Sequence, residues 1–254
     1  MTENVLEGVA LVTGAGSGIA RALALQLGTA GAVVAVADVN QKTAAETANA
    51  INAAGGTSAP FALDVADSRA VDDVVNVIER DLGPVTRLAN VAGVFSTSAL
   101  ADISDDQWAQ ILSVHLNGTF HLCRRLVPAM ASRGGGAVVN TSSIFALRGQ
   151  SEASHYAAAK GAIIGFSKSI AREVGDANVR VNVVAPGPVD TPFFAQGLSG
   201  EQLARVREER ARIIPLGKIG SAEEVASVIL FFLGEGSTHI TGQVIPVDGG
   251  EVMR

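Results

Sequence analysis

Tyr156 and Lys160 are the residues of this sequence whose types and spacing best fit proton transfer. They stand four residues apart in a predicted helix, so the phenol and the ammonium project from one face. A free tyrosine titrates near pH ~10, and a neighbouring ammonium favours the phenolate and lowers that pKa. Ser143 ends a predicted strand, where its hydroxyl could hold a substrate oxygen. Because such a Tyr/Lys pair is usually an ordinary surface feature, the assignment depends on the rest of the chain.

A glycine-rich loop lies between the first predicted strand, 9–13, and the first predicted helix, 19–28. It reads TGAGSGI, and its glycines allow a sharp turn and a close approach to a pyrophosphate. The helix that follows offers free N–H groups and the positive end of its dipole. The loop therefore predicts a dinucleotide site contacted by Gly14, Ser17, Gly18 and Ile19.

Asp38 ends the second predicted strand, 20 residues after Gly18. A carboxylate at this position can accept hydrogen bonds from the ribose hydroxyls of NAD. It would repel the additional phosphate of NADP by on the order of 1 kcal/mol in water and roughly 4 kcal/mol near a protein surface, per unit charge. Since no arginine stands in the loop or beside Asp38, we predict NAD as the cofactor. The alternative is a solvated turn aspartate.

Strand and helix patterns alternate along the whole chain. The predicted strands are short Val- and Ala-rich runs at 9–13, 32–37, 57–63, 85–90, 137–141, 180–185 and 244–247. The predicted helices span 19–28, 43–54, 68–82, 105–132, 155–174, 201–213 and 222–234. Most strands lack polar alternation, as expected when helices cover both faces of a parallel sheet. We therefore predict a single α/β domain over residues 1–254, built on a Rossmann-type, doubly wound, seven-stranded parallel sheet.

Composition limits the classes of partner. The net charge of −6 argues against a nucleic-acid partner, because nothing would neutralise the phosphates. No apolar run is long enough to span a bilayer, and the acidic start, with Glu3 and Glu7, does not resemble a signal peptide. The single cysteine, Cys123, cannot form an intrachain disulfide, and the histidines show no metal-ligand spacing. We predict a cytoplasmic protein with no metal, no membrane contact and no nucleic-acid partner.

Several motifs, in order along nearly the whole chain, together resemble the short-chain dehydrogenase/reductase family. They are the loop at 13–19, Asp64-Val65, Asn90-Val91-Ala92-Gly93, Ser143 with Tyr156-x-x-x-Lys160, Pro186–Thr191, and TGQ and DGG at 241–243 and 248–250. The resemblance is to NAD-preferring members similar to 3-oxoacyl-ACP reductases. It implies cofactor contacts at Asp64, Val65, Asn90, Ala92, Gly93, Tyr156, Lys160, Pro186, Val189 and Thr191.

The resemblance also implies a reaction. Tyr156 would give a proton to a carbonyl or take one from an alcohol, and Ser143 would orient that oxygen. Lys160 would lower the pKa of Tyr156 and bind the nicotinamide ribose. The cofactor would carry the hydride. The implied function is an NAD-dependent oxidoreductase that acts on a small-molecule secondary alcohol or ketone, in the homotetramer common in the family.

One position departs from the family pattern. His115 stands where the family usually has an asparagine that steadies a water in a proton relay. It is either a buried histidine on the helical stripe of Ile111 and Leu122, or a replacement for the relay residue, since imidazole both donates and accepts. A third alternative is an NAD(H)-binding protein whose turnover is impaired by His115. A related isomerase or dehydratase that keeps its nucleotide is a further alternative.

Substrate contacts are expected at the carboxyl ends of the strands. The resemblance places Phe145, Gln150 and a loop at about 190–216 around the substrate. Phe193 and Phe194, in that loop, either close over an apolar substrate or anchor the loop to the core. His155 is expected to be an exposed residue at the start of its helix.

Overall fold

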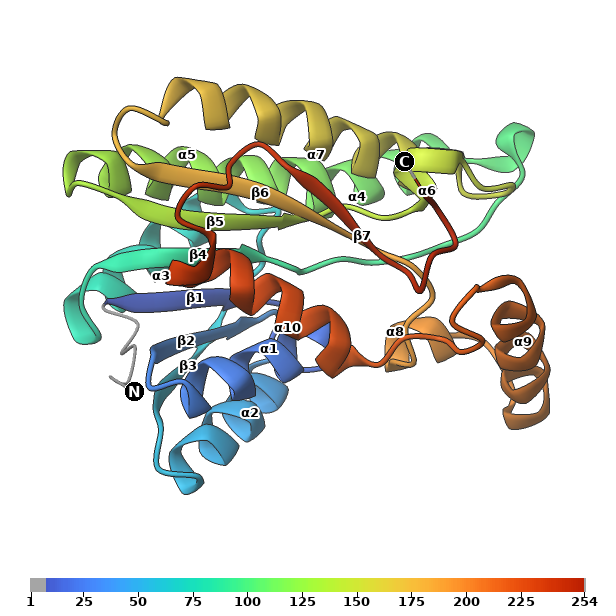
Figure 1. Ribbon diagram of the computed structural model, residues 1–254, viewed down its shortest axis with the longest axis horizontal. Helices are drawn as coiled ribbons and strands as arrows, with labels where there is room; N and C mark the ends of the chain where they lie inside the picture. Colours follow the sequence, from blue (N-terminus) through green and yellow to red (C-terminus); the bar gives the residue numbers. More distant parts are fainter. Residues whose placement is uncertain (1–7, 254) are drawn as a thin grey trace.

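The centre of the molecule is one parallel sheet of seven strands in the order β3-β2-β1-β4-β5-β6-β7. The computed structural model describes residues 8–253, so Glu3, Glu7 and the other residues of 1–7, together with residue 254, lie outside the described residues. The strands are β1 (Val9–Thr13), β2 (Val33–Asp38), β3 (Thr57–Ala62), β4 (Val85–Asn90), β5 (Gly136–Thr141), β6 (Val179–Pro186) and β7 (Val244–Val247). Their order and parallel pairing confirm the predicted Rossmann-type, doubly wound sheet (Figure 1).

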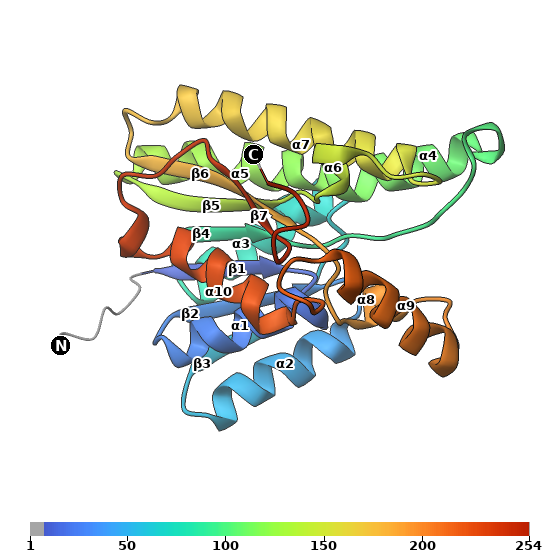
Figure 2. The same cartoon turned by 45° about the vertical axis from the view of Figure 1, so that its right-hand side comes forward.

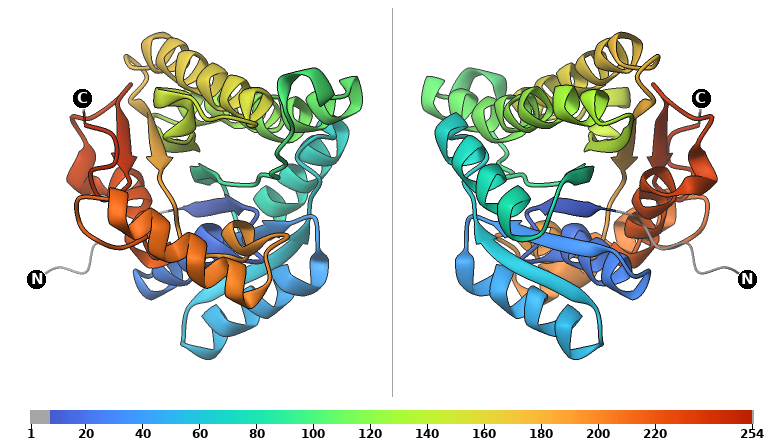
Figure 3. Two further views of the ribbon diagram at one scale, coloured as in Figure 1. Left: turned by 90° about the vertical axis from the view of Figure 1, so that its right-hand side faces the viewer. Right: turned by 90° about the vertical axis from the view of Figure 1, so that its left-hand side faces the viewer.

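Helices cover both faces of the sheet, as the two end views in Figure 3 show. One face carries α1 (Gly18–Thr29), α2 (Gln41–Ala53) and α10 (Ala222–Leu233). The opposite face carries α3 (Ser68–Asp81), α5 (Gly118–Ser132) and α7 (Ser154–Glu173). The helix α4 (Asp105–Leu112) leads into α5, and short 3₁₀ turns occur at Leu100–Asp102 and Glu235–Ser237.

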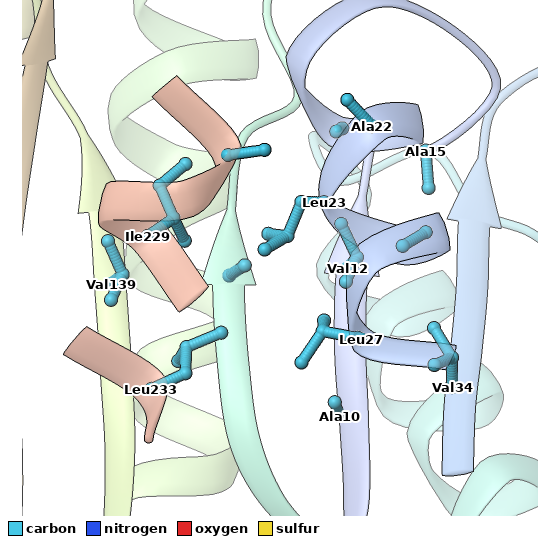
Figure 4. Close-up of a cluster of buried hydrophobic side chains, with 14 of the residues drawn as sticks. Ala10, Val12, Ala15, Ala22, Leu23, Leu27, Val34, Val139, Ile229 and Leu233 are labelled. Atoms are coloured by element: carbon cyan, nitrogen blue, oxygen red, sulfur yellow. The ribbon is translucent and has the colours of Figure 1, made fainter. Parts of the chain in front are cut away.

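Two apolar clusters join the three layers. Figure 4 shows the first, in which Leu23 and Leu27 of α1 and Ile229 and Leu233 of α10 cover strand residues such as Val12. The second lies between the other face of the sheet and α3, α5 and α7. All five residues of β1 are buried. Burial of both strand faces explains why the strand sequences show no polar alternation.

The start of α1 differs from the capped starts of α4, α9 (Gly200–Ile213) and α10. Ser104, Ser199 and Ser221 form capping boxes that satisfy the first N–H groups of α4, α9 and α10. In α1 the N-cap residue, Ser17, makes no side-chain cap hydrogen bond within residues 8–253, and the first turn holds no acidic residue. The first N–H groups of α1 are therefore available to an external acceptor.

Two predicted elements differ from the structure. The helix predicted over 105–132 is interrupted by a π-helical turn at Ser113–Asn117, which separates α4 from α5. The loop expected at about 190–216 contains the predicted helix at 201–213, which is α9, and in addition a short helix that was not predicted, α8 (Pro192–Ala195). A proline at the first helical position and a hydrogen bond from Phe194 N to Thr191 Oγ1 start α8.

The helices α6 (Phe145–Arg148), α8 and α9 lie at the same end of the molecule (Figures 1 and 2). This is the end at which the strands terminate, on the right of Figure 1. In open parallel sheets, ligands bind outside the carboxyl ends of the strands. These helices therefore border the edge where a functional site is expected.

Residues 8–253 contain neither a helix that could span a membrane nor a cluster of metal-binding side chains. None of the helices in this range combines the length and the apolar character needed to cross a membrane. The same range holds no group of three or more His, Cys, Asp or Glu residues that could bind a metal ion. Cys123 is buried, and burial raises the pKa of its thiol to about 12, as suits a core residue.

Candidate active site

Tyr156 lies near the start of α7, with its side chain buried. Lys160, one turn later, is also buried; its Nζ donates to the carbonyl oxygen of Thr141 at 2.7 Å and lies 5.7 Å from the centre of the Tyr156 ring. Ser143 follows β5, and its Oγ accepts a hydrogen bond from Phe145 N at 3.1 Å. The fold thus brings Ser143, Tyr156 and Lys160 together at the carboxyl end of the sheet.

Burial sets the proton affinity of both titratable groups. It raises the pKa of Tyr156 well above the usual range, and hydrogen bonding by Ser143 offsets this only in part. It lowers the pKa of Lys160 to about 7. The net shift is therefore opposite to the expected lowering of the Tyr156 pKa by Lys160, because burial outweighs the effect of the ammonium, which donates to the Thr141 carbonyl. At neutral pH Tyr156 is a protonated phenol.

His115 lies in the π-helical turn and is buried beside Tyr156. The two rings are perpendicular, with centres 5.2 Å apart. His115 Nε2 lies 2.7 Å from the carbonyl oxygen of Val94 and 3.2 Å from its nitrogen, while Nδ1 is buried with no hydrogen-bond partner in residues 8–253. Burial, and then the charge of Lys160, holds the pKa of His115 well below its usual range. His115 is therefore a buried, neutral residue within the site.

His155 is buried, which corrects the expectation of an exposed residue at the helix start. Its Nε2 lies 3.0 Å from Ser96 Oγ. The segment after β4 passes over the start of α7, and Ser98 N donates to the carbonyl oxygen of Glu152 at 2.8 Å. This packing, which the local sequence does not show, covers His155.

The glycine loop provides space that side chains would fill. Gly14 has a φ of +72°, and a Cβ atom there would lie 2.8 Å from Cα of Ala92. A Cβ atom on Gly16 would lie 2.2 Å from Thr43 Oγ1. The loop therefore requires glycine at position 14, whereas a side chain at position 16 would displace those of Thr43 and Asp38; the loop leads directly into the uncapped start of α1. Such a cradle fits the pyrophosphate of a dinucleotide.

Asp38 lies beside this loop at the end of β2. Its Oδ2 accepts a hydrogen bond from Gly16 N at 2.9 Å, and its Oδ1 accepts one from Asn40 N at 2.9 Å. These bonds fix the carboxylate, and each oxygen keeps a second lone pair. The position fits the ribose hydroxyls next to the pyrophosphate.

The other predicted cofactor residues lie along the same edge. Asp64 is exposed after β3, whereas Val65 is buried. Asn90 turns into the interior, where its amide donates to Asn140 Oδ1 at 2.8 Å. Gly93 follows β4, and a Cβ atom there would lie 2.4 Å from the His115 ring.

Residues after β6 complete this edge. Pro186 is the last residue of β6. Val189 is buried and forms a parallel bridge with Gly220. A Cβ atom on Gly18 would lie 3.4 Å from the methyl group of Thr191, so the segment after β6 lies against the glycine loop.

The predicted substrate residues divide into two groups. Phe145 lies with its ring centre 6.2 Å from that of Tyr156, and Phe193 stacks at 5.7 Å on Phe95. In contrast, Gln150 Oε1 accepts a hydrogen bond from Arg148 at 3.1 Å. Phe95 is a residue that the sequence interpretation missed. The available signal was an aromatic side chain just after the Asn-x-Ala-Gly segment at the end of a strand.

These features define a class. A doubly wound parallel sheet, a glycine loop that opens its first helix, and a buried Ser/Tyr/Lys group at the same edge are the parts of a dinucleotide-dependent oxidoreductase. Asp38, the acidic residue at the end of β2, is a further feature of this class.

Comparisons with known proteins agree with this class. A family model described as "Enoyl-(Acyl carrier protein) reductase" matches residues 14–251. The chain is 35% identical over 250 residues to 3-oxoacyl-[acyl-carrier-protein] reductase of Thermotoga maritima, covering 98% of this chain and 99% of that protein. It is 35% identical over 242 residues to cyclohexanol dehydrogenase of an Acinetobacter species, covering 95% and 93%. The crystal structure of levodione reductase matches with a TM-score of 0.92 at 30% identity, covering 96% of each chain.

The chain belongs to the short-chain dehydrogenase/reductase family. It is a hydride-transfer oxidoreductase that acts on alcohol or ketone groups with a nicotinamide cofactor. The alternative of a nucleotide-binding protein without turnover is not favoured by these relatives.

Proposed function

We propose that this protein interconverts a secondary alcohol and its ketone with NAD(H), using Tyr156 as the general acid and base. The observation that supports this most directly is the burial of the Tyr156 phenol beside Ser143 and Lys160, at the sheet edge that carries the glycine loop. Two relatives are named for 3-oxoacyl-[acyl-carrier-protein] and for cyclohexanol, which share this alcohol and ketone chemistry.

Ser143 and Tyr156 act on the same substrate oxygen in this mechanism. Ser143 Oγ accepts a hydrogen bond from Phe145 N and hydrogen-bonds to Tyr156, so its O–H is placed to donate to a substrate oxygen that Tyr156 also contacts. Tyr156 then gives its proton to the oxygen as the ketone is reduced, or receives the proton as the alcohol is oxidised. When bound, the nicotinamide supplies or accepts the hydride.

The proton affinity of Tyr156 favours one form of the site. Since burial raises the pKa of Tyr156, the phenol is the resting form, and this form protonates a ketone oxygen. Oxidation needs the phenolate, which a charged Lys160 stabilises. The pKa of Lys160, about 7, means that this support is strongest on the acidic side of neutrality.

Asp38 is the residue that selects NAD over NADP in this proposal. Its fixed carboxylate has lone pairs left for two ribose hydroxyls. A phosphate on that ribose would meet the negative charge instead. We also propose a homotetramer and a cytoplasmic location, which stay predictions.

Replacing Tyr156 with phenylalanine tests the proposed function. Positioned proton transfer contributes about 10²–10⁴-fold to a rate, so Tyr156→Phe should lower kcat by at least about that factor. NADH binding should be kept, because the ring and its packing remain. Turnover is measured from NADH absorbance with a panel of secondary alcohols and ketones, and binding from NADH fluorescence.

Three results would contradict the proposal. Retention of most activity by Tyr156→Phe would remove the phenol from the mechanism. Cofactor binding by the wild type without turnover of any panel member would favour a binding protein. A product formed with no net change in NADH would favour an isomerase or a dehydratase.

A further inference from the structure

Two phenylalanines, Phe95 and Phe145, pack on the ring of Tyr156, and a third, Phe193, packs on Phe95. The ring centre of Phe95 lies 5.1 Å from that of Tyr156, at an interplanar angle of 87°. Phe145 lies 6.2 Å from Tyr156 at 77°, and Phe193 lies 5.7 Å from Phe95 at 41°. We call Phe95, Phe145 and Phe193 the aromatic collar. Its members come from the segment after β4, from α6 and from α8, so only the fold brings them together.

The collar has an open side. Phe95 and Phe145 are half-buried, and Phe193 is 41% exposed. None of the three belongs to the two large clusters that hold the sheet and helices together. Phe193 therefore packs on the collar and not on the core, which favours a substrate contact over a simple anchor for its loop.

Arg148, which lies over the Phe145 ring, and the arginines of the nearby helix α9 form ion pairs with acidic side chains, and Arg148 shares Glu251 with Arg210. Arg148 Nη2 lies 2.9 Å from Glu251 Oε1, and the Arg148 guanidinium lies 5.1 Å from the centre of the Phe145 ring. All four arginines of α9 form ion pairs, namely Arg205 with Glu209, Arg207 with Asp190, Arg210 with Glu251 and Arg212 with Glu208. A negatively charged substrate arm would have to compete with these carboxylates. The surroundings favour an uncharged substrate.

The segment that carries Phe95 is fixed on both sides. His115 Nε2 bonds to the backbone of Val94, and His155 Nε2 bonds to Ser96 Oγ. Both imidazoles are buried. Because His115 and His155 hold the residues on either side of Phe95, the Phe95 ring keeps its place against Tyr156. This contact gives His115 a positioning role through Val94.

From these contacts we propose that Phe95, with Phe145 and Phe193, is a specificity-determining group that selects uncharged substrates whose reacting carbon lies in an apolar ring. The inference rests on the proposed function and narrows its substrate class. In the oxidative direction, the hydroxyl proton of the ring carbinol would pass to the Tyr156 phenolate, and a bound nicotinamide would accept the hydride as the C–H bond of the same carbon breaks. An apolar ring presents a broad surface to the collar. An extended acyl thioester presents only a narrow chain.

The test compares three ketone probes with NADH as the reductant. Cyclohexanone is the ring probe, butan-2-one is an uncharged probe without a ring, and acetoacetyl-CoA is a charged acyl thioester. The proteins are the wild type, Phe95→Leu, Phe95→Ala and a control, Phe231→Ala, at an exposed phenylalanine of α10. Thermal unfolding and NADH binding show whether each variant is folded.

We expect the wild type to have its highest kcat/KM with cyclohexanone. Phe95→Ala should lower that value by about tenfold, mainly through KM, with a smaller loss for butan-2-one. Phe95→Leu should fall between, since it keeps apolar bulk without a flat ring. Phe231→Ala should match the wild type with all three probes.

The outcomes distinguish a failure of the ring selectivity from a failure of the proposed function. A wild type that prefers acetoacetyl-CoA, or a Phe95→Ala protein that loses the same factor with both uncharged ketones, overturns the ring selectivity and leaves the proposed function standing. A wild type that reduces none of the three probes, while still binding NADH, overturns the proposed function and this inference with it.

Discussion

The two halves of the site are built by different means. The cofactor half is made mainly of backbone: the glycine loop lies against Ala92, and Asp38 is fixed by the main-chain N–H groups of Gly16 and Asn40. The substrate half is made of side chains from distant segments, which are the aromatic collar and the ion pairs of α9. Its apolar core is a separate small cluster around Tyr156 and Ile111.

This difference has a physical consequence. A backbone cradle tolerates few substitutions, because the space it leaves is set by glycines and by main-chain atoms. A wall of side chains can change its shape by rotamer changes and substitutions without disturbing the sheet. We therefore expect changes in the cofactor half to affect cofactor binding and stability strongly, and changes in the substrate half to affect substrate choice.

Cofactor preference should show the largest effect. Asp38→Asn removes the charge but keeps one acceptor oxygen, so the ratio of kcat/KM for NADP⁺ to that for NAD⁺ should rise by about fivefold to thousandfold. The control is Glu46→Gln, which removes a charge from the exposed surface of α2. An unchanged ratio in Asp38→Asn would show that this carboxylate does not select the cofactor.

A pair of alanine substitutions measures the cost of filling the cradle. Gly14 and Gly31 both have positive φ, +72° and +83°, but only Gly14 faces another backbone; around Gly31 a Cβ atom would meet no described atom within 4 Å. Gly14→Ala should lower the free energy of unfolding by about 1–3 kcal/mol more than Gly31→Ala, as overpacking does. Urea unfolding gives the stability, and NADH titration gives the affinity. Equal losses would mean that the loop adapts and that the cradle is not rigid.

A substitution in the substrate half should have the smallest effect on cofactor binding. Glu251 pairs with Arg148 of α6 and Arg210 of α9, so Glu251→Gln should weaken the attachment of α9 to the segment after β7. We expect a loss of stability on the order of 1–3 kcal/mol, because the largely buried carboxylate holds two guanidinium groups, and a raised KM for the ketone with the KM for NADH unchanged. Glu209→Gln, which breaks a pair within α9 alone, is the matched control. An altered KM for NADH in Glu251→Gln would contradict the separation of the two halves.

The sequence predicted the secondary-structure elements that build the cofactor half. Its strands, helices and glycine loop are local patterns, and β1, β4 and β7 begin and end where the periodicity placed them. The spacing of Tyr156 and Lys160 also fixed their common face, because one helix carries both. The direction of the Tyr156 pKa was wrong, since burial is a property of the whole fold.

What the sequence alone determined is the order of its elements and hence the sheet, because periodicity, glycines and caps act over a few residues. The tertiary structure alone decided which side chains meet. Phe95 reaches Tyr156, and His155 is covered by Ser96, through contacts between segments about 60 residues apart that no local pattern specifies. For the same reason the structure, and not the sequence, placed His115 against the Val94 backbone.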